Sequence, residues 1–297
     1  MKNNISYEKY LEMMKQEVAA RTGKRVQLQT IRKNNGLVLD GLTIIAEDTN
    51  VSPTIYLNGY YKEFLVAGID AVVKRVIAIY EENKPELSFD ISKIMDISKV
   101  RPHIKMKLIN YEENRELLEA VPYIQILDLA VVFIVVLETE DEYQFGTILV
   151  HNGFLDYWEI EVDSLYEIAK ENMRNDFQTI PMENIITAVI DEALVDECIE
   201  EMKFDMFVLT NYTRLHGAVG MLQTELLNAI MKKYKTKKLI ILPSSVHEVL
   251  LVPYNKDMEE TDFKTMVREV NETQLEPEEY LSNNVYVYDG NELKFFE

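Results

Sequence analysis

Residues 239–253 read LIILPSSVHEVLLVP, and this stretch indicates the class of fold. Two short apolar runs flank a polar segment that starts at Pro243. Apolar runs of four to eight residues bounded by turn residues are typical of buried strands. We therefore interpret Pro243-Ser244-Ser245 as a turn between two strands. Residues 246–252 are predicted to form a strand in the middle of a sheet.

Further patterns extend this β framework and place helices around it. The sequences RVQLQTIR (25–32) and LVLDGLTII (37–45) flank Asn35-Gly36, a pair that supplies the two positive φ angles of a tight hairpin. Residues 129–137 and 145–160 are rich in apolar residues, and Asn152-Gly153 is interpreted as a turn in the second stretch. Apolar residues at helical spacing follow Ser6 and recur over 217–234. We predict an α+β fold of mixed, largely antiparallel sheets with packed helices.

The stretch from Glu82 to Pro102 is the best candidate for a domain boundary. It is polar, contains two prolines and shows no clear hydrophobic period. We expect an N-terminal α/β unit over residues 1–90, built from the hairpin and its helices, and a larger C-terminal α+β unit over 100–297. A chain of 297 residues is long enough for two such units without disulfide or metal support.

Composition restricts the setting in which the protein works. The chain has 31 basic and 51 acidic residues, and a formal charge of −20 disfavours direct binding to nucleic acid or anionic membranes. Cys198 is the single cysteine, so no disulfide can form within the chain. The longest apolar run, 129–137, is far shorter than the ~20 residues of a spanning helix. We expect a cytoplasmic protein without a membrane segment, whose partner is a protein or a small molecule.

Ser244, Ser245, His247 and Glu248 are the candidate catalytic residues, since they combine nucleophile, base and carboxylate in one short segment. Alternation along a strand would place Ser245 and His247 on one face and Glu248 on the other. Glu248 would then be unable to orient the imidazole as the acid of a catalytic triad. Three interpretations stay open: a hydrogen-bonded structural turn, a ligand-binding segment, and a serine nucleophile with a histidine base.

A second candidate site is the start of the helical pattern at 217–234. Asn211, His216 and Gly217 lie before or at its first turn, where backbone N–H groups can bind an anion. Close packing of the helix on a sheet explains the glycine equally well. The sequence has no glycine-rich phosphate-binding loop, and its histidines lack the spacing of a metal site. We expect no cofactor and no metal; the histidines are His103, His151, His216 and His247.

Five motifs span almost the whole chain: KNNG (33–36), PTIYLNGYY (53–61), LDLAVVF (127–133), PSSVHEVLL (243–251) and MVREVN (266–271). In these motifs the chain resembles an uncharacterised domain family of unknown function, found mainly in gut and rumen Firmicutes and often in mobile or conjugative elements. The resemblance implies a bacterial, cytoplasmic protein. It implies no catalytic activity, because the family has no catalytic assignment.

Two functions follow as hypotheses. The first is an intracellular binding or regulatory protein of a bacterium or its mobile elements, because no complete catalytic set is visible and an acidic surface suits an interaction protein. The alternative is a small-molecule enzyme, hydrolytic in type, centred on the PSSVHE segment. Convergence of its polar side chains in an accessible pocket would favour the enzyme. Side chains bonded to backbone atoms would favour the binding protein.

Overall fold

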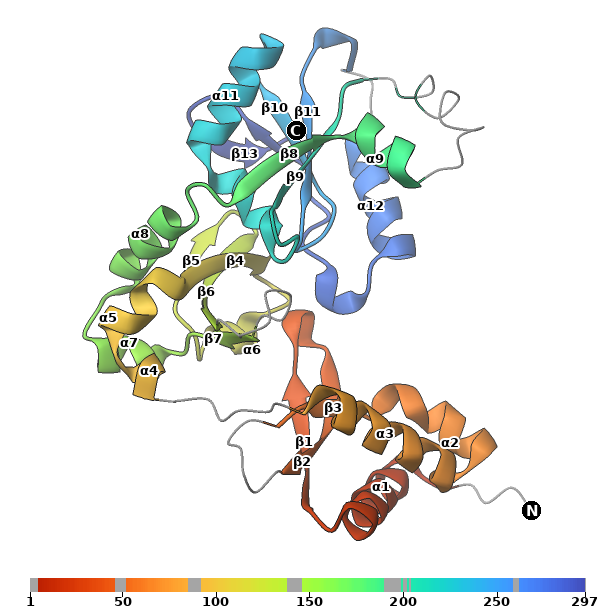
Figure 1. Cartoon of the computed structure of the whole chain (residues 1–297). Helices are drawn as coiled ribbons and strands as arrows, with labels where there is room; N and C mark the ends of the chain where they lie inside the picture. The colour runs from red at the N-terminus through yellow and green to blue at the C-terminus, as the bar shows by residue number, and fades with distance from the viewer. Residues whose placement is uncertain are drawn as a thin grey trace. The chain divides into compact units, whose positions relative to one another are not determined.

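The computed structural model of the protein describes residues 5–45, 52–84, 92–137, 146–189, 199, 202, 204–258 and 262–296. The chain forms two compact units, Met1–Ser92 and Lys93–Glu297 (Figure 1). Each unit has its own sheets and its own hydrophobic core, so each is described by itself.

The N-terminal unit packs its helices against a three-stranded antiparallel sheet of order β1-β2-β3. Alternate strand residues point into its core, which includes Val26, Leu42 and Ile44. Helical residues three or four apart complete the core, among them Tyr10 and Val76. The elements are α1 (Tyr7–Thr22), β1 (Arg25–Arg32), η1 (Asn34–Gly36), β2 (Val38–Ile45), β3 (Thr54–Tyr56), η2 (Asn58–Tyr60), α2 (Tyr61–Ala67) and α3 (Ile69–Asn83).

Local sequence sets the ends of these elements. The Ser6 hydroxyl accepts a hydrogen bond from the backbone N–H of Lys9 at the start of α1, and Gly23 ends the helix in the left-handed region. Between β1 and β2, Asn35 and Gly36 have φ angles of 57° and 67°. The hairpin predicted from this Asn-Gly pair is therefore confirmed.

In the C-terminal unit, the apolar stretch at 129–137 forms β6, the central strand of a four-stranded antiparallel sheet. β4 pairs along one edge of β6, while β5 and β7 follow each other along the other edge. Residues 129–135 are all buried, which explains why this strand is apolar on both faces. The elements around this sheet are α4 (Ser92–Met95), α5 (Ile97–Val100), η3 (Arg101–His103), β4 (Ile104–Asn110), α6 (Arg115–Leu118), β5 (Tyr123–Ile126), β6 (Leu129–Leu137), β7 (Gly146–Leu149), α7 (Asn152–Trp158) and α8 (Val162–Asn172).

The second sheet of this unit has six antiparallel strands in the order β13-β12-β10-β11-β9-β8, with the LIILPSSVHEVLLVP hairpin at its centre. Its described elements are β8 (Phe177–Pro181), α9 (Met182–Val189), β9 (Phe207–Asn211), η4 (Gly217–Leu222), α11 (Thr224–Tyr234), β10 (Leu239–Pro243), β11 (Val249–Pro253), η5 (Lys256–Met258), α12 (Phe263–Gln274), η6 (Pro277–Glu279), β12 (Tyr286–Tyr288) and β13 (Leu293–Phe295).

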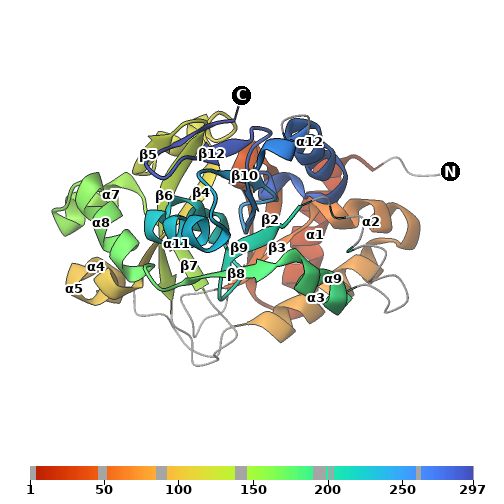
Figure 2. The ribbon, with the colours of Figure 1, turned by 90° about the horizontal axis from the view of Figure 1, so that it is seen from above.

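Helices α11 and α12 cover opposite faces of the six-stranded sheet. The ring of Tyr234 in α11 lies 4.7 Å from that of Phe207, centroid to centroid. Phe263 in α12 instead belongs to a cluster with Ile240 and Val252. The strand register puts Phe207 and Ile240 on opposite faces of the sheet, since side chains alternate along each strand. Figures 1 and 2 show the two helices on either side of β10.

A polar cluster around Asp128, in the two-residue turn between β5 and β6, joins the two sheets of this unit. The Asp128 carboxylate accepts hydrogen bonds from the side chains of Ser282 (2.6 Å), Asn284 (2.9 Å) and Tyr286 (2.7 Å). The buried Asn110 side chain donates a further bond, of 3.0 Å, to the backbone of the segment before β12. These contacts fix the four-stranded sheet against the end of the chain.

The strand predicted at 246–252 begins later than expected. β11 starts at Val249, because the backbone N–H of Ser245 donates to the carbonyl of Glu248 at 3.1 Å and closes a turn over residues 244–248. Alternation along a strand therefore does not apply to His247. The expected placement of Ser245 and His247 on one strand face is wrong for this reason.

Two further sequence predictions are corrected. Asn152-Gly153 does not turn between strands but opens α7, where the Asn152 side chain donates to the carbonyl of Glu119 at 3.1 Å. The helix expected over 217–234 is two elements, η4 and α11, separated at Gln223. A Cβ at Gly220 would lie 2.7 Å from the Phe177 ring, so η4 packs closely against β8 at this glycine.

The α+β class with largely antiparallel sheets is confirmed, and the strand pairings seen across the described ranges are all antiparallel. Within those same ranges, no helix combines the length and the apolar character needed to cross a membrane.

The division into two units leads to a prediction about limited proteolysis. We expect a protease at low concentration to cut first between Glu82 and Pro102, because boundaries between compact units are cleaved before their cores. The products should be two fragments that resist further digestion, identified by intact mass. Protection of this stretch, with cleavage elsewhere, would contradict the two-unit organisation.

The Asp128 cluster predicts a graded series of stabilities. Asp128→Ala should lower the free energy of unfolding by about 3 kcal/mol, because each buried donor left without an acceptor costs about 1–3 kcal/mol. Tyr286→Phe removes one of the three donors and should cost about 1 kcal/mol. Urea unfolding measures both, with the exposed Asp156→Ala as control. Equal stability of Asp128→Ala and the control would show that the cluster does not hold the sheets together.

Candidate functional site

The loop after β9 is held in one shape by Asn211. The Asn211 Nδ2 donates to the carbonyl of Leu215 at 2.7 Å, and its Oδ1 accepts from the Leu215 N–H and the Thr213 hydroxyl, both at 3.1 Å. Arg214 and His216 have φ angles of 56° and 59°, a conformation that costs an L-residue about 1–2 kcal/mol. The side chain of Asn211 therefore holds a strained loop, residues 211–216.

The PSSVHE turn lies against this loop, and its polar atoms bond mostly to backbone. The Ser245 Oγ accepts from the backbone N–H of His247 at 3.0 Å. The carbonyl of His247 accepts from the Thr210 hydroxyl at 2.9 Å. The carbonyl of Glu248 accepts from the N–H groups of Ser245 and Ser244, at 3.1 and 3.4 Å. These bonds close the hairpin between β10 and β11.

His216 and His247 join the loop to the turn. The backbone N–H of His216 donates to Nδ1 of His247 at 3.1 Å, and the two rings stack with centroids 5.4 Å apart. Nε2 of His247 lies 3.7 Å from a carboxylate oxygen of Glu279. Because Nδ1 is an acceptor, a neutral His247 carries its proton on Nε2, on the side of Glu279. The His247 side chain is 27% exposed.

Gly217 follows His216 in the chain, and its surroundings leave no space for a side chain. A Cβ there would lie 2.4 Å from the Thr210 hydroxyl oxygen, 2.5 Å from the backbone nitrogen of Asn211 and 2.7 Å from the carbonyl oxygen of His247. The glycine is required by close backbone approach. Close packing therefore explains Gly217, which the sequence also associated with anion binding.

A cavity of about 100 Å³ lies between the Asn211–His216 loop and the four-stranded sheet. Its apolar lining comes from Met106, Ile134, Val136, Met173 and Leu215. Its polar lining comes from Lys105, Thr147, Asn211, Thr213 and His216. Lys105 forms an ion pair with Asp176, so the one charged lining residue is already neutralised.

His216 brings a neutral imidazole to this cavity. Burial, and to a smaller extent the charges of Lys107 and His247, lower the pKa of His216 to about 3. Its Nδ1 is buried and has no hydrogen-bond partner among the described residues. The ring is therefore uncharged at neutral pH.

The structure brings together the residues that the sequence singled out in two separate stretches. Ser244, Ser245, His247 and Glu248 form the turn, and Asn211, His216 and Gly217 lie against it. Of these seven, Asn211 and His216 line the cavity. The sequence missed Lys105, Met106 and Met173 in the cavity wall and Glu279 beside His247, since none of them is near the two motifs in the chain.

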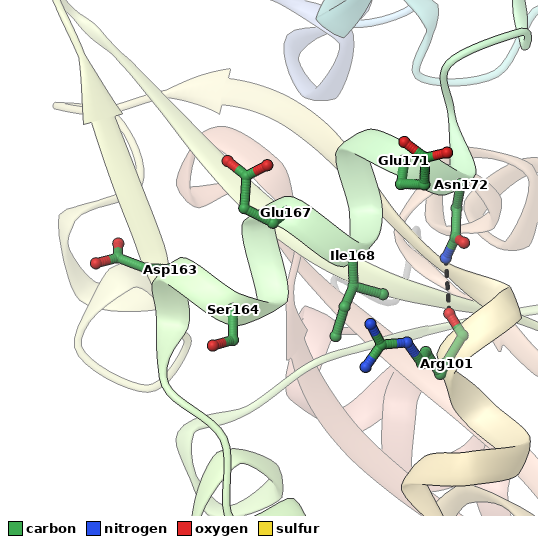
Figure 3. A pocket seen from close by; sticks show the side chains of 7 residues that line it. All are labelled: Arg101, Asp163, Ser164, Glu167, Ile168, Glu171 and Asn172. Atoms are coloured by element: carbon green, nitrogen blue, oxygen red, sulfur yellow. Dashed lines mark hydrogen bonds between the residues drawn. The ribbon is translucent and has the colours of Figure 1, made fainter.

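A shallower depression of about 490 Å³ lies on the surface of α8. Asp163, Glu167 and Glu171 are spaced four residues apart along the helix, while Arg101 and Asn172 complete the lining with Ile168 and Ser164. Figure 3 shows the Asn172 amide bonded to the backbone carbonyl of Arg101, at 2.7 Å. Across the described residues, no three His, Cys, Asp or Glu side chains cluster closely enough to hold a metal ion. The carboxylates form a solvated acidic face.

The profile of one protein family matches residues 7–290, and its description is Family of unknown function (DUF5688). The chain belongs to this family. The resemblance to an uncharacterised family, seen in its motifs, is therefore confirmed. No curated protein and no solved structure is similar enough to match the chain. Membership of DUF5688 carries no activity, so a function for the protein has to be argued from its own geometry.

The junction between the histidines predicts the effect of changing His247. His247→Ala should lower the free energy of unfolding by about 1–3 kcal/mol, because the backbone N–H of His216 loses its acceptor. His247→Asn should restore most of the loss, since its amide oxygen can replace Nδ1 as acceptor. Urea denaturation at pH 7 measures both variants, with the exposed His151→Ala as control. An equal loss for the alanine and asparagine variants would contradict this role of Nδ1.

The low pKa of His216 predicts a stability that depends on pH. An unfolded chain takes up a proton at this histidine as pH falls below about 6.5, whereas the folded protein does so only near pH 3. The free energy of unfolding should therefore fall with pH across this window, by at most about 2 kcal/mol between pH 6.5 and 5. His216→Asn, which tolerates the left-handed backbone, should show a flatter dependence. Urea titrations at several pH values measure the free energy of unfolding of the wild type and of His216→Asn. The same dependence on pH in both proteins would rule out a buried neutral His216.

Proposed function

We propose that the protein is a non-catalytic binding protein that recognises another protein through the Asn211–His216 loop. One observation carries the proposal: the loop is rigidly held, and it presents Tyr212, Arg214 and Leu215 to solvent. The side chain of Tyr212 is 68% exposed and that of Leu215 is 51% exposed. Large side chains exposed on a strained, braced loop favour contact with a partner.

The composition of the loop suits protein recognition. Tyrosine and arginine are enriched among the residues that contribute most to protein interfaces. A loop that is already ordered loses little conformational entropy on binding, so more of the contact energy appears as affinity. Backbone strain of the kind seen at Arg214 and His216 is concentrated at functional sites.

The negative charge of the C-terminal unit favours a partner with a basic surface. Residues 1–92 contain 12 basic and 12 acidic residues, so the C-terminal unit holds the remaining 19 basic and 39 acidic ones. The whole net charge of −20 thus belongs to the unit that carries the loop. A field of this sign accelerates encounter with a positively charged surface and repels an acidic one.

The hydrolytic alternative receives less support from the contacts of the PSSVHE segment. A serine nucleophile is normally hydrogen-bonded to the nitrogen of its general base. The bonds of Ser245 and His247 described above lead instead to backbone groups, from His247 N–H to Ser245 and from His216 N–H to His247. These residues fit a framework for the loop better than an acid–base pair.

The cellular setting is proposed from the sequence. The family resemblance and the single cysteine favour the cytoplasm of a bacterium, and the resemblance connects the protein with mobile or conjugative elements. Within that setting, a binding or regulatory role needs no bound cofactor. Direct contact with nucleic acid is disfavoured by the charge of the C-terminal unit.

The proposal predicts that Tyr212 is essential for partner binding. The full chain, its Tyr212→Ala variant and a Tyr157→Ala control are used to capture proteins from the organism that encodes it. Tyr157 belongs to the same unit and is 58% exposed, so the control matches in residue type and exposure. A basic protein should be captured by the wild type and the control and should be depleted with Tyr212→Ala.

The captured protein is then purified and its Kd measured by calorimetry. Tyr212→Ala should weaken binding at least tenfold, about 1.4 kcal/mol, and added salt should slow association. An unchanged Kd for Tyr212→Ala would remove the loop from the interface. Turnover of ester substrates that is abolished by Ser245→Ala would instead support the hydrolytic alternative.

A further inference from the structure

We propose that the outer edge of β1 binds an extended, acidic segment of a partner protein, which joins the three-stranded sheet as a further strand. β1 (Arg25–Arg32) ends the strand order β1-β2-β3, and within the described ranges it pairs with β2 alone. The site lies in the N-terminal unit and takes an acidic ligand. It is therefore independent of the loop in the C-terminal unit that is proposed to bind a basic protein.

The contacts of Asp40 in β2 show which backbone groups of β1 point outward. The carbonyl of Asp40 accepts from the N–H of Leu57 at 2.8 Å, and its N–H donates to Oδ1 of Asn58 at 2.8 Å. Both groups therefore point to the β3 side, away from β1. Thr30 lies opposite Asp40 in the register, and the two residues of such a pair turn their backbone groups away from each other. Thr30, and Leu28 two residues before it, consequently direct their N–H and C=O groups to the outer edge.

This edge lacks two features that block strand pairing in many proteins. β1 pairs with β2 over eight consecutive residues without a bulge, and no proline interrupts it. Leu28 is half-buried and Thr30 is exposed. The outward backbone groups of these two residues have no hydrogen-bond partner among the described residues. An extended peptide can bond to them by adding a strand to the sheet.

Alternation along β1 sets the pattern of side chains in the ligand. Arg25, Gln27 and Gln29 are exposed on one face of the strand, whereas Val26 and Leu28 lie on the face that packs on the core. A strand added at the edge alternates in the same way. It therefore places apolar side chains beside Leu28 and polar side chains beside Arg25, where cross-strand pairs contribute to binding.

The charge of the strand favours acidic side chains in the ligand. Four basic residues belong to β1 or flank it directly: Lys24, Arg25, Arg32 and Lys33. Residues 18–39 contain no acidic side chain, and Asp40 in β2 already accepts hydrogen bonds from Tyr7 and Thr30. Antiparallel pairing with β1 of a second copy would place Arg25 opposite Arg32, and like charges in that position are destabilising. The edge thus disfavours its own copy and favours a segment that carries glutamate or aspartate.

The inference predicts slower hydrogen exchange at the outward amides when a peptide binds. A synthetic peptide that alternates glutamate and valine is titrated into the full-length protein, and the exchange of backbone amides is followed by NMR. The amides of Leu28 and Thr30 should become protected at saturation, whereas that of Gln29, which faces β2, should not change. In calorimetry, a peptide with lysine in place of glutamate should bind about tenfold more weakly.

Two substitutions at Thr30 assign the binding to the strand edge. Thr30→Pro removes the outward N–H and leaves the bonds between β1 and β2 in place, since proline is tolerated on the solvent side of an edge strand. Thr30→Val is the matched control. Both variants lose the 3.1 Å bond from the Thr30 hydroxyl to Asp40, but valine keeps the N–H. Thr30→Pro should bind the glutamate peptide about tenfold more weakly than Thr30→Val.

Several results would overturn the inference. They are unchanged exchange of the Leu28 and Thr30 amides at saturation, equal affinity of the two Thr30 variants, equal affinity for the glutamate and lysine peptides, and tighter binding of a single-stranded oligonucleotide than of the glutamate peptide. Slow exchange of the Gln29 amide shows that the hairpin is intact in each variant. If Thr30→Pro loses that protection, the exchange result in the wild type decides the question.

Discussion

The C-terminal unit depends on the hydrogen bonds that the carboxylate of Asp128 accepts. This carboxylate accepts three hydrogen bonds from residues more than 150 positions later in the chain, Ser282, Asn284 and Tyr286. A half-buried carboxylate requires such donors, because without them its desolvation would oppose folding. The bonds hold the four-stranded sheet against the end of the six-stranded one. The cavity depends on this placement, since its wall combines β4, β6 and β7 with the loop after β9.

The polar residues of the PSSVHE segment have a role at this junction that differs from catalysis. Ser245 and Thr210 bond to the backbone of residue 247, and His247 supplies an acceptor for the backbone of His216. Side chains that satisfy buried backbone groups allow a loop to keep an unfavourable conformation. The two positive φ angles of the loop are maintained in this way.

Much of the fold could be read from local patterns. The Asn35-Gly36 hairpin, the Ser6 cap and the fully buried strand at 129–137 were predictable because each depends on the conformational preference of a few neighbouring residues. The start of β11 was not predictable from the sequence. A hydrogen bond from the backbone N–H of Ser245 to the carbonyl of Glu248 closes a turn where strand pairing was expected. The turn predicted at Asn152-Gly153 is wrong for a similar reason. The Asn152 side chain bonds to the carbonyl of Glu119, and the dipeptide begins a helix instead.

The sequence by itself determined an acidic chain with an α+β framework, and it marked two stretches, at Asn211–Gly217 and Ser244–Glu248, as unusual. Hydrophobic period, turn chemistry and charge are local or additive properties, so a single sequence reports them. Only the tertiary structure decided that these stretches meet, that Met106 and Met173 complete a cavity beside them, and that burial keeps His216 neutral. Those facts depend on contacts between residues distant in the chain, which periodicity and composition do not encode.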